Sequence, residues 1–157
     1  MTTIQTEHFT KALNLLLDET FSSVQGIYLD KGTSLFETLA TISAQEASVP
    51  VGGKCASLAA QVKHIIFYLD VIEKAARTGE FEENDWGEIW RTTEKVSAEE
   101  WQKIQANLQA AYERTKQFID EQADWNSEDK LAMAMAFVVH TAYHLGEIRQ
   151  ALCTLKR

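Results

Sequence analysis

Apolar side chains recur at spacings of three and four residues along most of this chain, the period of a helix that buries one face. No stretch shows the alternation of apolar and polar residues that predicts a strand. The apolar periods predict four long helices, over residues of about 6–25, 56–77, 98–122 and 127–155. Four amphipathic helices bury their apolar faces together as a four-helix bundle, so the predicted fold is all-α.

Two serines mark helix starts. Ser34 is followed three residues later by Glu37, and Ser97 by Glu100, so in each pair both side chains can satisfy free backbone amides reciprocally. The first pair predicts one short additional helix that ends at about Ala44. The second pair predicts the start of the third long helix.

The connections are predicted from turn residues and from loss of the apolar period. The only proline and a Gly-Gly pair predict a loop over residues 48–54, and Gly79 ends the second long helix. Residues 80–97 are acidic and aromatic without a clear period, which predicts an irregular connection that covers one end of the bundle. Asn126 or Ser127 is the predicted N-cap of the last helix.

Length and composition indicate one domain over residues 1–157, since 157 residues with 45% hydrophobic side chains suffice for one sizeable core. No apolar run reaches the roughly 18 residues of a membrane span and the first residues do not resemble a signal peptide, so we expect a cytoplasmic protein without a membrane partner. Two distant cysteines are then expected to stay reduced. The net charge of −8 opposes phosphate binding, which argues against nucleic-acid partners.

Two histidines stand out in "HTAYHLGEIRQAL", residues 140–152. His140 and His144 are four residues apart, so on a helix their side chains lie one above the other and can point at one small object. Both belong to the apolar stripe of the last helix, which comprises Met133, Phe137, His140, His144, Ile148, Ala151 and Leu155. Buried imidazoles need partners, and either a divalent metal ion or ordinary hydrogen bonds can supply them.

A third histidine favours the metal. His64 lies beside the apolar stripe of the second long helix, from which it can face another helix across the core. Three histidines from two helices would form a site with an open coordination position, as a catalytic zinc requires. His8, among polar neighbours near the N-terminus, is predicted to be solvated and without a role.

Two further residues are candidates for a catalytic role. Glu147, three residues after His144, could orient a ligand or accept a proton, or be an ordinary solvated glutamate. Tyr68, one turn after His64, could offer its hydroxyl to a bound species, or be a packed aromatic with its tip in water.

The remaining polar and aromatic candidates are predicted to be structural. Each cysteine, Cys55 and Cys153, is nine residues from the nearest site histidine on its helix, about 13 Å along the axis, which is too far for a ligand to the same ion. Gly146 is expected to permit close helix approach or to leave space beside the site, which is a packing role in either case. The tryptophans at 86, 90, 101 and 125 are expected to fill the core or a dimer surface rather than to line a pocket.

The three histidines also carry a family resemblance. "VKHIIFYLDV" around His64 and the terminal H-x3-H-x-G-x-I-R resemble the DinB superfamily of DinB/YfiT-like metalloenzymes, and the similarity extends over most of the chain. The resemblance implies a four-helix bundle, frequently a homodimer, in which His64, His140 and His144 bind nickel, zinc or iron. It also implies a low-molecular-weight thiol as a cofactor, because some relatives are thiol-dependent S-transferases.

Two main functions remain open at this stage. One is a metal-dependent enzyme, a thiol S-transferase or a hydrolase, in which the ion activates a thiol or water. The other is a non-catalytic bundle, such as a stress-related dimer, in which the ion only ties two helices together. A carrier of apolar ligands is a third possibility, and it rests on the aromatic content alone.

Overall fold

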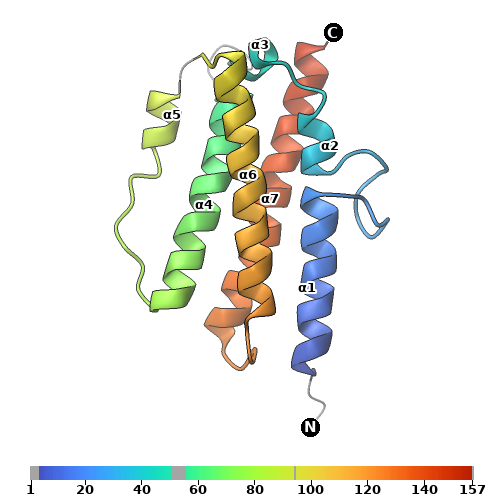
Figure 1. The fold of residues 1–157 in the computed structure, drawn as a ribbon, viewed down its shortest axis with the longest axis vertical. Coiled ribbons are helices and arrows are strands. Elements are labelled where there is room, and N and C mark those ends of the chain that lie inside the picture. Colours follow the sequence, from blue (N-terminus) through green and yellow to red (C-terminus); the bar gives the residue numbers. More distant parts are fainter. Residues whose placement is uncertain (1–3, 51–55, 94, 157) are drawn as a thin grey trace.

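The computed structural model describes residues 4–50, 56–93 and 95–156, and all regular elements within these ranges are helices (Figure 1). An isolated bridge between Pro50 and Ser57 is the only β-type pairing there. The helices are α1 (Thr6–Phe21), α2 (Leu35–Leu39), α3 (Ala44–Ala47), α4 (Leu58–Thr78), α5 (Glu88–Thr92), α6 (Ala98–Asp120) and α7 (Glu128–Leu155).

Four long helices, α1, α4, α6 and α7, form the bundle, which confirms the predicted fold class. Helix α4 packs against α6 and α7, and α1 packs against the same two helices, so α1 and α4 stand at opposite corners. Helices α1 and α7 run in one direction and α4 and α6 in the other (Figure 1). Helices α4 and α7, which carry the three candidate histidines, are therefore antiparallel neighbours.

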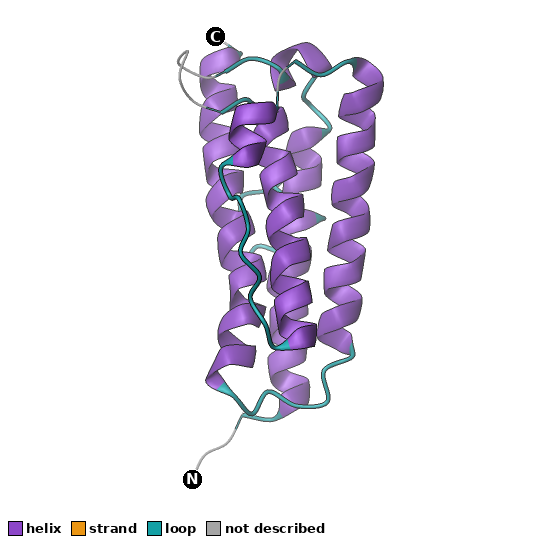
Figure 2. Cartoon of the chain, turned by 90° about the vertical axis from the view of Figure 1, so that its left-hand side faces the viewer, coloured by secondary structure: helices purple, strands orange, loops and turns teal. Residues whose placement is uncertain are grey.

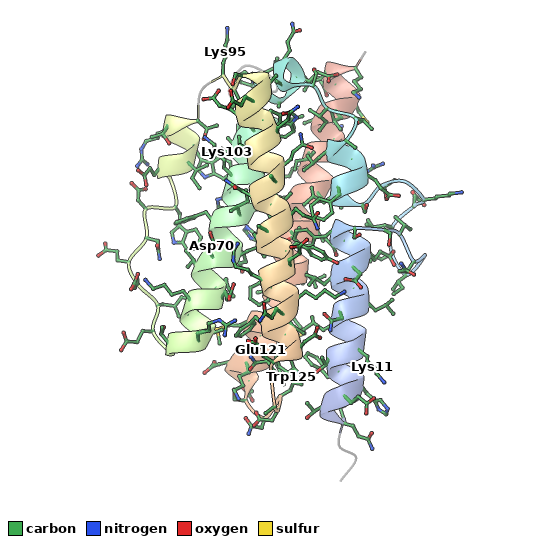
Figure 3. All side chains as sticks on the ribbon, viewed as in Figure 1. Lys11, Asp70, Lys95, Lys103, Glu121 and Trp125 are labelled. Atoms are coloured by element: carbon green, nitrogen blue, oxygen red, sulfur yellow. The ribbon has the colours of Figure 1, made fainter. Side chains whose placement is uncertain are left out.

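The core is built from apolar side chains of all four long helices. Removing such a side chain from water contributes about 1.5–3 kcal/mol, so the apolar stripes account for the association of the helices. Charged side chains such as Lys11, Asp70 and Lys95 are exposed around the outside (Figure 3). The fully buried side chains include Leu17, Phe21, Ile65, Leu69, Leu108, Ile119, Phe137, Leu145 and Ile148.

The predicted helix starts are confirmed. Capping boxes are present at Ser34 and Ser97, and the Ser127 hydroxyl accepts a hydrogen bond from the Lys130 backbone N–H. The single short helix predicted to end at about Ala44 is instead two helices, α2 and α3. A further capping box at Ser43 starts α3, and its hydroxyl accepts from the Glu46 N–H.

Helix α1 is shorter than predicted, because it ends at Phe21 rather than at about Gln25. The buried carboxylate of Glu19 accepts hydrogen bonds from the backbone N–H groups of Gln25, Ile27, Tyr28 and Leu29, at 2.7–3.2 Å. Burial alone would raise the pKa of this carboxyl, but the four donors outweigh it and lower the pKa below its usual value. The loop is thereby folded back against the end of α1.

The segment between α4 and α6 returns the chain along the outside of the bundle (Figure 2). It begins at Gly79, whose φ of 76° is the left-handed conformation that glycine adopts readily at a helix end. It carries α5, which packs against α4, within the region predicted to be irregular. Near the far end of the segment, the Val96 N–H donates a hydrogen bond to the Ser48 hydroxyl at 2.9 Å.

Helix α7 is the only helix in the described part of the chain whose length and apolar composition would suffice to cross a membrane. A helix buried in a protein core meets the same criteria, so the observation is weak evidence for a membrane. Helix α7 packs against both α1 and α4 and supplies the buried side chains of Phe137, Leu145 and Ile148. Because 39% of its most apolar window is buried, its place in the core accounts for part of its hydropathy.

Candidate metal centre

The structure brings together the three histidines selected from the sequence. His64 of α4 faces His140 and His144 of α7, with ring centroids 5.1 Å and 4.8 Å away, and the two α7 rings are 4.5 Å apart. One potential ligand atom from each residue lies within 4.8 Å of the others. His8 is exposed in the first turn of α1 and remote from this cluster in the sequence.

The cluster is shielded from water and contains unpaired nitrogen atoms. His64 and His144 are buried and His140 is half-buried. His64 Nδ1 and His140 Nε2 are buried and have no hydrogen-bond partner. A buried polar atom without a partner costs about 1–3 kcal/mol, and a metal ion bound to these lone pairs would remove that cost. The donor set therefore fits a divalent ion.

The three rings are held in the neutral form that binds metals. Burial, together with the neighbouring imidazoles, lowers the pKa of His64 to about 4 and that of His140 to about 3, and Glu147 opposes the shift at His64. Burial also lowers the pKa of His144, against the opposing effect of the Glu147 carboxylate. At neutral pH each ring therefore keeps a lone pair available for a ligand bond.

Two side chains orient His144. Its Nδ1 lies 2.6 Å from Gln61 Oε1 and 2.9 Å from Glu147 Oε2, so an N–H on Nδ1 can donate to both. This assignment leaves Nε2 free to bind an ion. Metal-binding histidines usually donate their second N–H to a carboxylate or carbonyl oxygen in this way. Glu147, a candidate from the sequence, thus contacts the cluster through His144.

Gln61 was missed by the sequence reasoning. It lies on α4 three residues before His64, a spacing that places two side chains on the same helix face. That spacing was a usable signal. A glutamine side chain can both donate and accept hydrogen bonds, however, and nothing in the sequence indicates which residue would be its hydrogen-bond partner.

Aromatic rings surround the cluster, and we call Tyr68, Trp86 and Trp90 the aromatic wall. The Tyr68 ring stacks on His140 with centroids 3.5 Å apart and an angle of 11° between the planes. Trp90 lies 4.5 Å from the His64 ring, and Trp86 lies 6.3 Å from it. Tyr68 therefore packs against a histidine ring, and burial raises the pKa of its hydroxyl.

The tryptophans do not all behave as predicted. Trp101 is buried, and its Nε1 donates to the Ile42 carbonyl at 2.9 Å, so it fills the core as expected. Trp86 and Trp90 are partly exposed and lie against His64 instead, so the expectation of core filling is wrong for these two rings, and the dimer surface stays a prediction. The reason is the path of the segment after Gly79, which carries both rings to α4.

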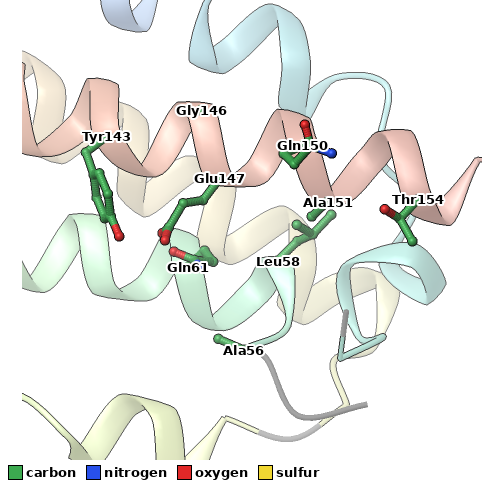
Figure 4. Close-up of a pocket in the computed structure, with 9 residues that line it drawn as sticks. All are labelled: Ala56, Leu58, Gln61, Tyr143, Gly146, Glu147, Gln150, Ala151 and Thr154. Atoms are coloured by element: carbon green, nitrogen blue, oxygen red, sulfur yellow. The ribbon is translucent and has the colours of Figure 1, made fainter. Parts of the chain in front are cut away.

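A pocket of about 490 Å³ lies between α4 and α7, next to the cluster (Figure 4). Glu147 points from α7 toward Gln61 of α4, and Tyr143 lies one turn before Glu147. Apolar side chains such as Leu58 and Ala151 line the other part. The pocket therefore shares the two side chains that orient His144.

Cys153 is exposed near the end of α7 and does not belong to the cluster. Cys55 lies outside the described residues. Gly146 has open space where a Cβ would be and lines the pocket, so of its two expected roles the structure shows space beside the site rather than close helix approach.

No family model matches this chain, and neither do any curated protein or any solved structure. The fold and the site themselves define the class of protein. It is an all-α bundle with a buried cluster of three histidines that could bind a metal ion.

Proposed function

We propose that His64, His140 and His144 bind one divalent metal ion, and that the chain is a metal-dependent enzyme of the DinB-like type. The observation that carries the proposal is a set of three neutral rings with ligand atoms within 4.8 Å of one another, two of them with buried, unpartnered nitrogens. The DinB-like assignment is supported by one histidine on the second long helix and an H-x3-H pair on the last. Imidazole ligands suit nickel, zinc and iron alike.

The chemistry follows from the charge of the ligands. Three neutral imidazoles would leave the charge of a divalent ion uncompensated, which makes a thiol or a water molecule beside it more acidic and supplies a nucleophile at neutral pH. Gln61 and Glu147 orient His144, and Glu147 is near enough to this ring to receive a proton released at the site. We therefore propose thiol S-transfer or hydrolysis as the reaction class.

The alternative is a structural ion in a non-catalytic bundle. A structural zinc site is usually closed by four protein ligands, whereas a catalytic site keeps a position for water or substrate. Among the described histidine, cysteine and acidic residues, the cluster contains three potential ligands. This count favours an open site and hence the catalytic proposal.

Metal analysis of the full chain, purified without a polyhistidine tag, tests the proposal. After incubation with zinc or nickel and dialysis, we expect roughly one ion per chain, and a loss of most of it in His144→Ala. His8→Ala is the matched control, because His8 is exposed, and it should bind as the wild type does. Fewer than about 0.1 ions per wild-type chain would refute the metal site.

A second measurement separates the catalytic ion from the structural one. If the ion is catalytic, the metal-free chain should still unfold cooperatively on heating, and small thiols should change the absorption spectrum of the cobalt-substituted chain. If metal removal unfolds the chain and no thiol changes that spectrum, the ion is structural.

A further inference from the structure

The rings of the aromatic wall stand between the histidine cluster and solvent. Trp86 is 40% exposed and Trp90 is 37% exposed, yet both rings lie against the buried His64. Trp86 also packs edge-on against Phe67, with centroids 5.3 Å apart, and lies 6.1 Å from Tyr68. A molecule that reaches the histidines from this side must contact these rings.

The segment that carries the two tryptophans is weakly attached to the bundle. Helix α5 has no buried residue, and α4 is the main helix that it packs against. The Asp85–Arg91 ion pair lies within the segment, and the Lys74–Glu82 pair joins it to α4, but both are exposed. Exposed ion pairs contribute little, about 0–1 kcal/mol, so ring contacts provide most of the attachment.

We propose that Tyr68, Trp86 and Trp90 form the substrate-binding wall of the site and select a ligand with an aromatic or apolar body. The inference rests on the proposed metal site and names the substrate class for it. An aromatic ligand can stack on the indole rings and gain more binding free energy than the burial of its apolar area alone supplies. Its metal-binding group, a thiol in the test below, would lose its proton to solvent on binding.

Two thiols with the same sulfur chemistry test the proposal on the cobalt-loaded full chain. Phenylmethanethiol carries an aromatic ring, and 2-mercaptoethanol is small and polar. Titration of the sulfur-to-cobalt absorption gives an affinity for each thiol. We expect phenylmethanethiol to bind at least about tenfold more tightly than 2-mercaptoethanol.

Variants show whether the preference comes from the wall. Trp86→Ala and Trp90→Ala should each reduce the aromatic preference to about threefold or less. Trp125→Ala is the matched control, because Trp125 packs against Phe9 with centroids 5.0 Å apart, away from the histidines, and it should keep the wild-type preference.

The outcomes are distinguishable from failure of the metal site. The visible spectrum of cobalt without thiol reports metal binding alone, so its absence would refute the proposed function itself. Equal affinity of the cobalt-loaded chain for the two thiols, or an aromatic preference unchanged in both tryptophan variants, would overturn the substrate class.

Discussion

His144 is oriented by two acceptors that share one N–H, and the metal affinity should depend on both of them. Gln61 Oε1 lies 2.6 Å and Glu147 Oε2 lies 2.9 Å from Nδ1. Removing one acceptor leaves the other to hold the ring and its tautomer. We therefore expect Gln61→Ala and Glu147→Ala to weaken metal binding moderately, and the double variant to weaken it strongly.

The expected sizes follow from the two hydrogen bonds. A bond to a neutral amide oxygen contributes about 1 kcal/mol, so Gln61→Ala should weaken binding about fivefold. A bond to a carboxylate contributes more, but Glu147 is 37% exposed and solvent screens it, so about tenfold is expected for Glu147→Ala. Together these losses amount to about fiftyfold, within the range of roughly 10–100-fold found when such outer partners are removed.

Competition with a chromophoric chelator measures the zinc affinity of each variant. Gln150→Ala is the matched control, because Gln150 lines the same pocket of α7 and makes no hydrogen bond to a histidine among those described. Thermal unfolding of the metal-free variants checks that the fold is unchanged. A double variant that binds zinc within about twofold of the wild type would refute the orienting role.

Two further predictions concern stability. The pKa values of His64 and His140 are lowered from 6.5 to about 4 and about 3, so protonation of these two rings below pH 6.5 favours the unfolded chain. For the metal-free chain, we expect these rings to cost no stability above pH 6.5. The free energy of unfolding should fall by more than about 1 kcal/mol as the pH falls from 6.5 toward 4. Urea titrations between pH 6.5 and 4 should show that His140→Phe loses less unfolding free energy than the wild type does. Equal losses in the two proteins would contradict the argument that burial lowers the pKa of His140. Leu17→Ala should cost about 2–5 kcal/mol because Leu17 is fully buried, whereas Leu15→Ala, at a side chain 44% exposed, should stay within about 0.5 kcal/mol in the same titrations.

The fold could be predicted from local patterns where the structure uses local interactions. The capping boxes at Ser34 and Ser97 need only residues three positions apart, and both are present. The end of α1 could not be predicted in the same way, because Glu19 accepts from N–H groups six to ten residues further along the chain. The Ser43–Glu46 box was readable, since it has the same spacing as the other two.

The sequence predicts only those site residues whose positions follow from the spacing along a helix. His140 and His144 follow from their spacing, and His64 follows from its place beside an apolar stripe. The contact of Trp90 with His64 depends on how the 79–97 segment crosses α4, and no period in the sequence reports such a path. The homodimer and the cytoplasmic location stay predictions of the sequence.

Because α4 and α6 run in the same direction, the chain must travel back along the bundle between them. This return segment carries Trp86 and Trp90, whereas the three histidines sit on α4 and α7, which also form the packed core. In the proposed function, substitutions in the segment would therefore alter which molecules bind while the helices and the histidines keep their places. Metal retention would depend on α4 and α7, whereas two of the three wall rings, Trp86 and Trp90, belong to a separate stretch of the chain.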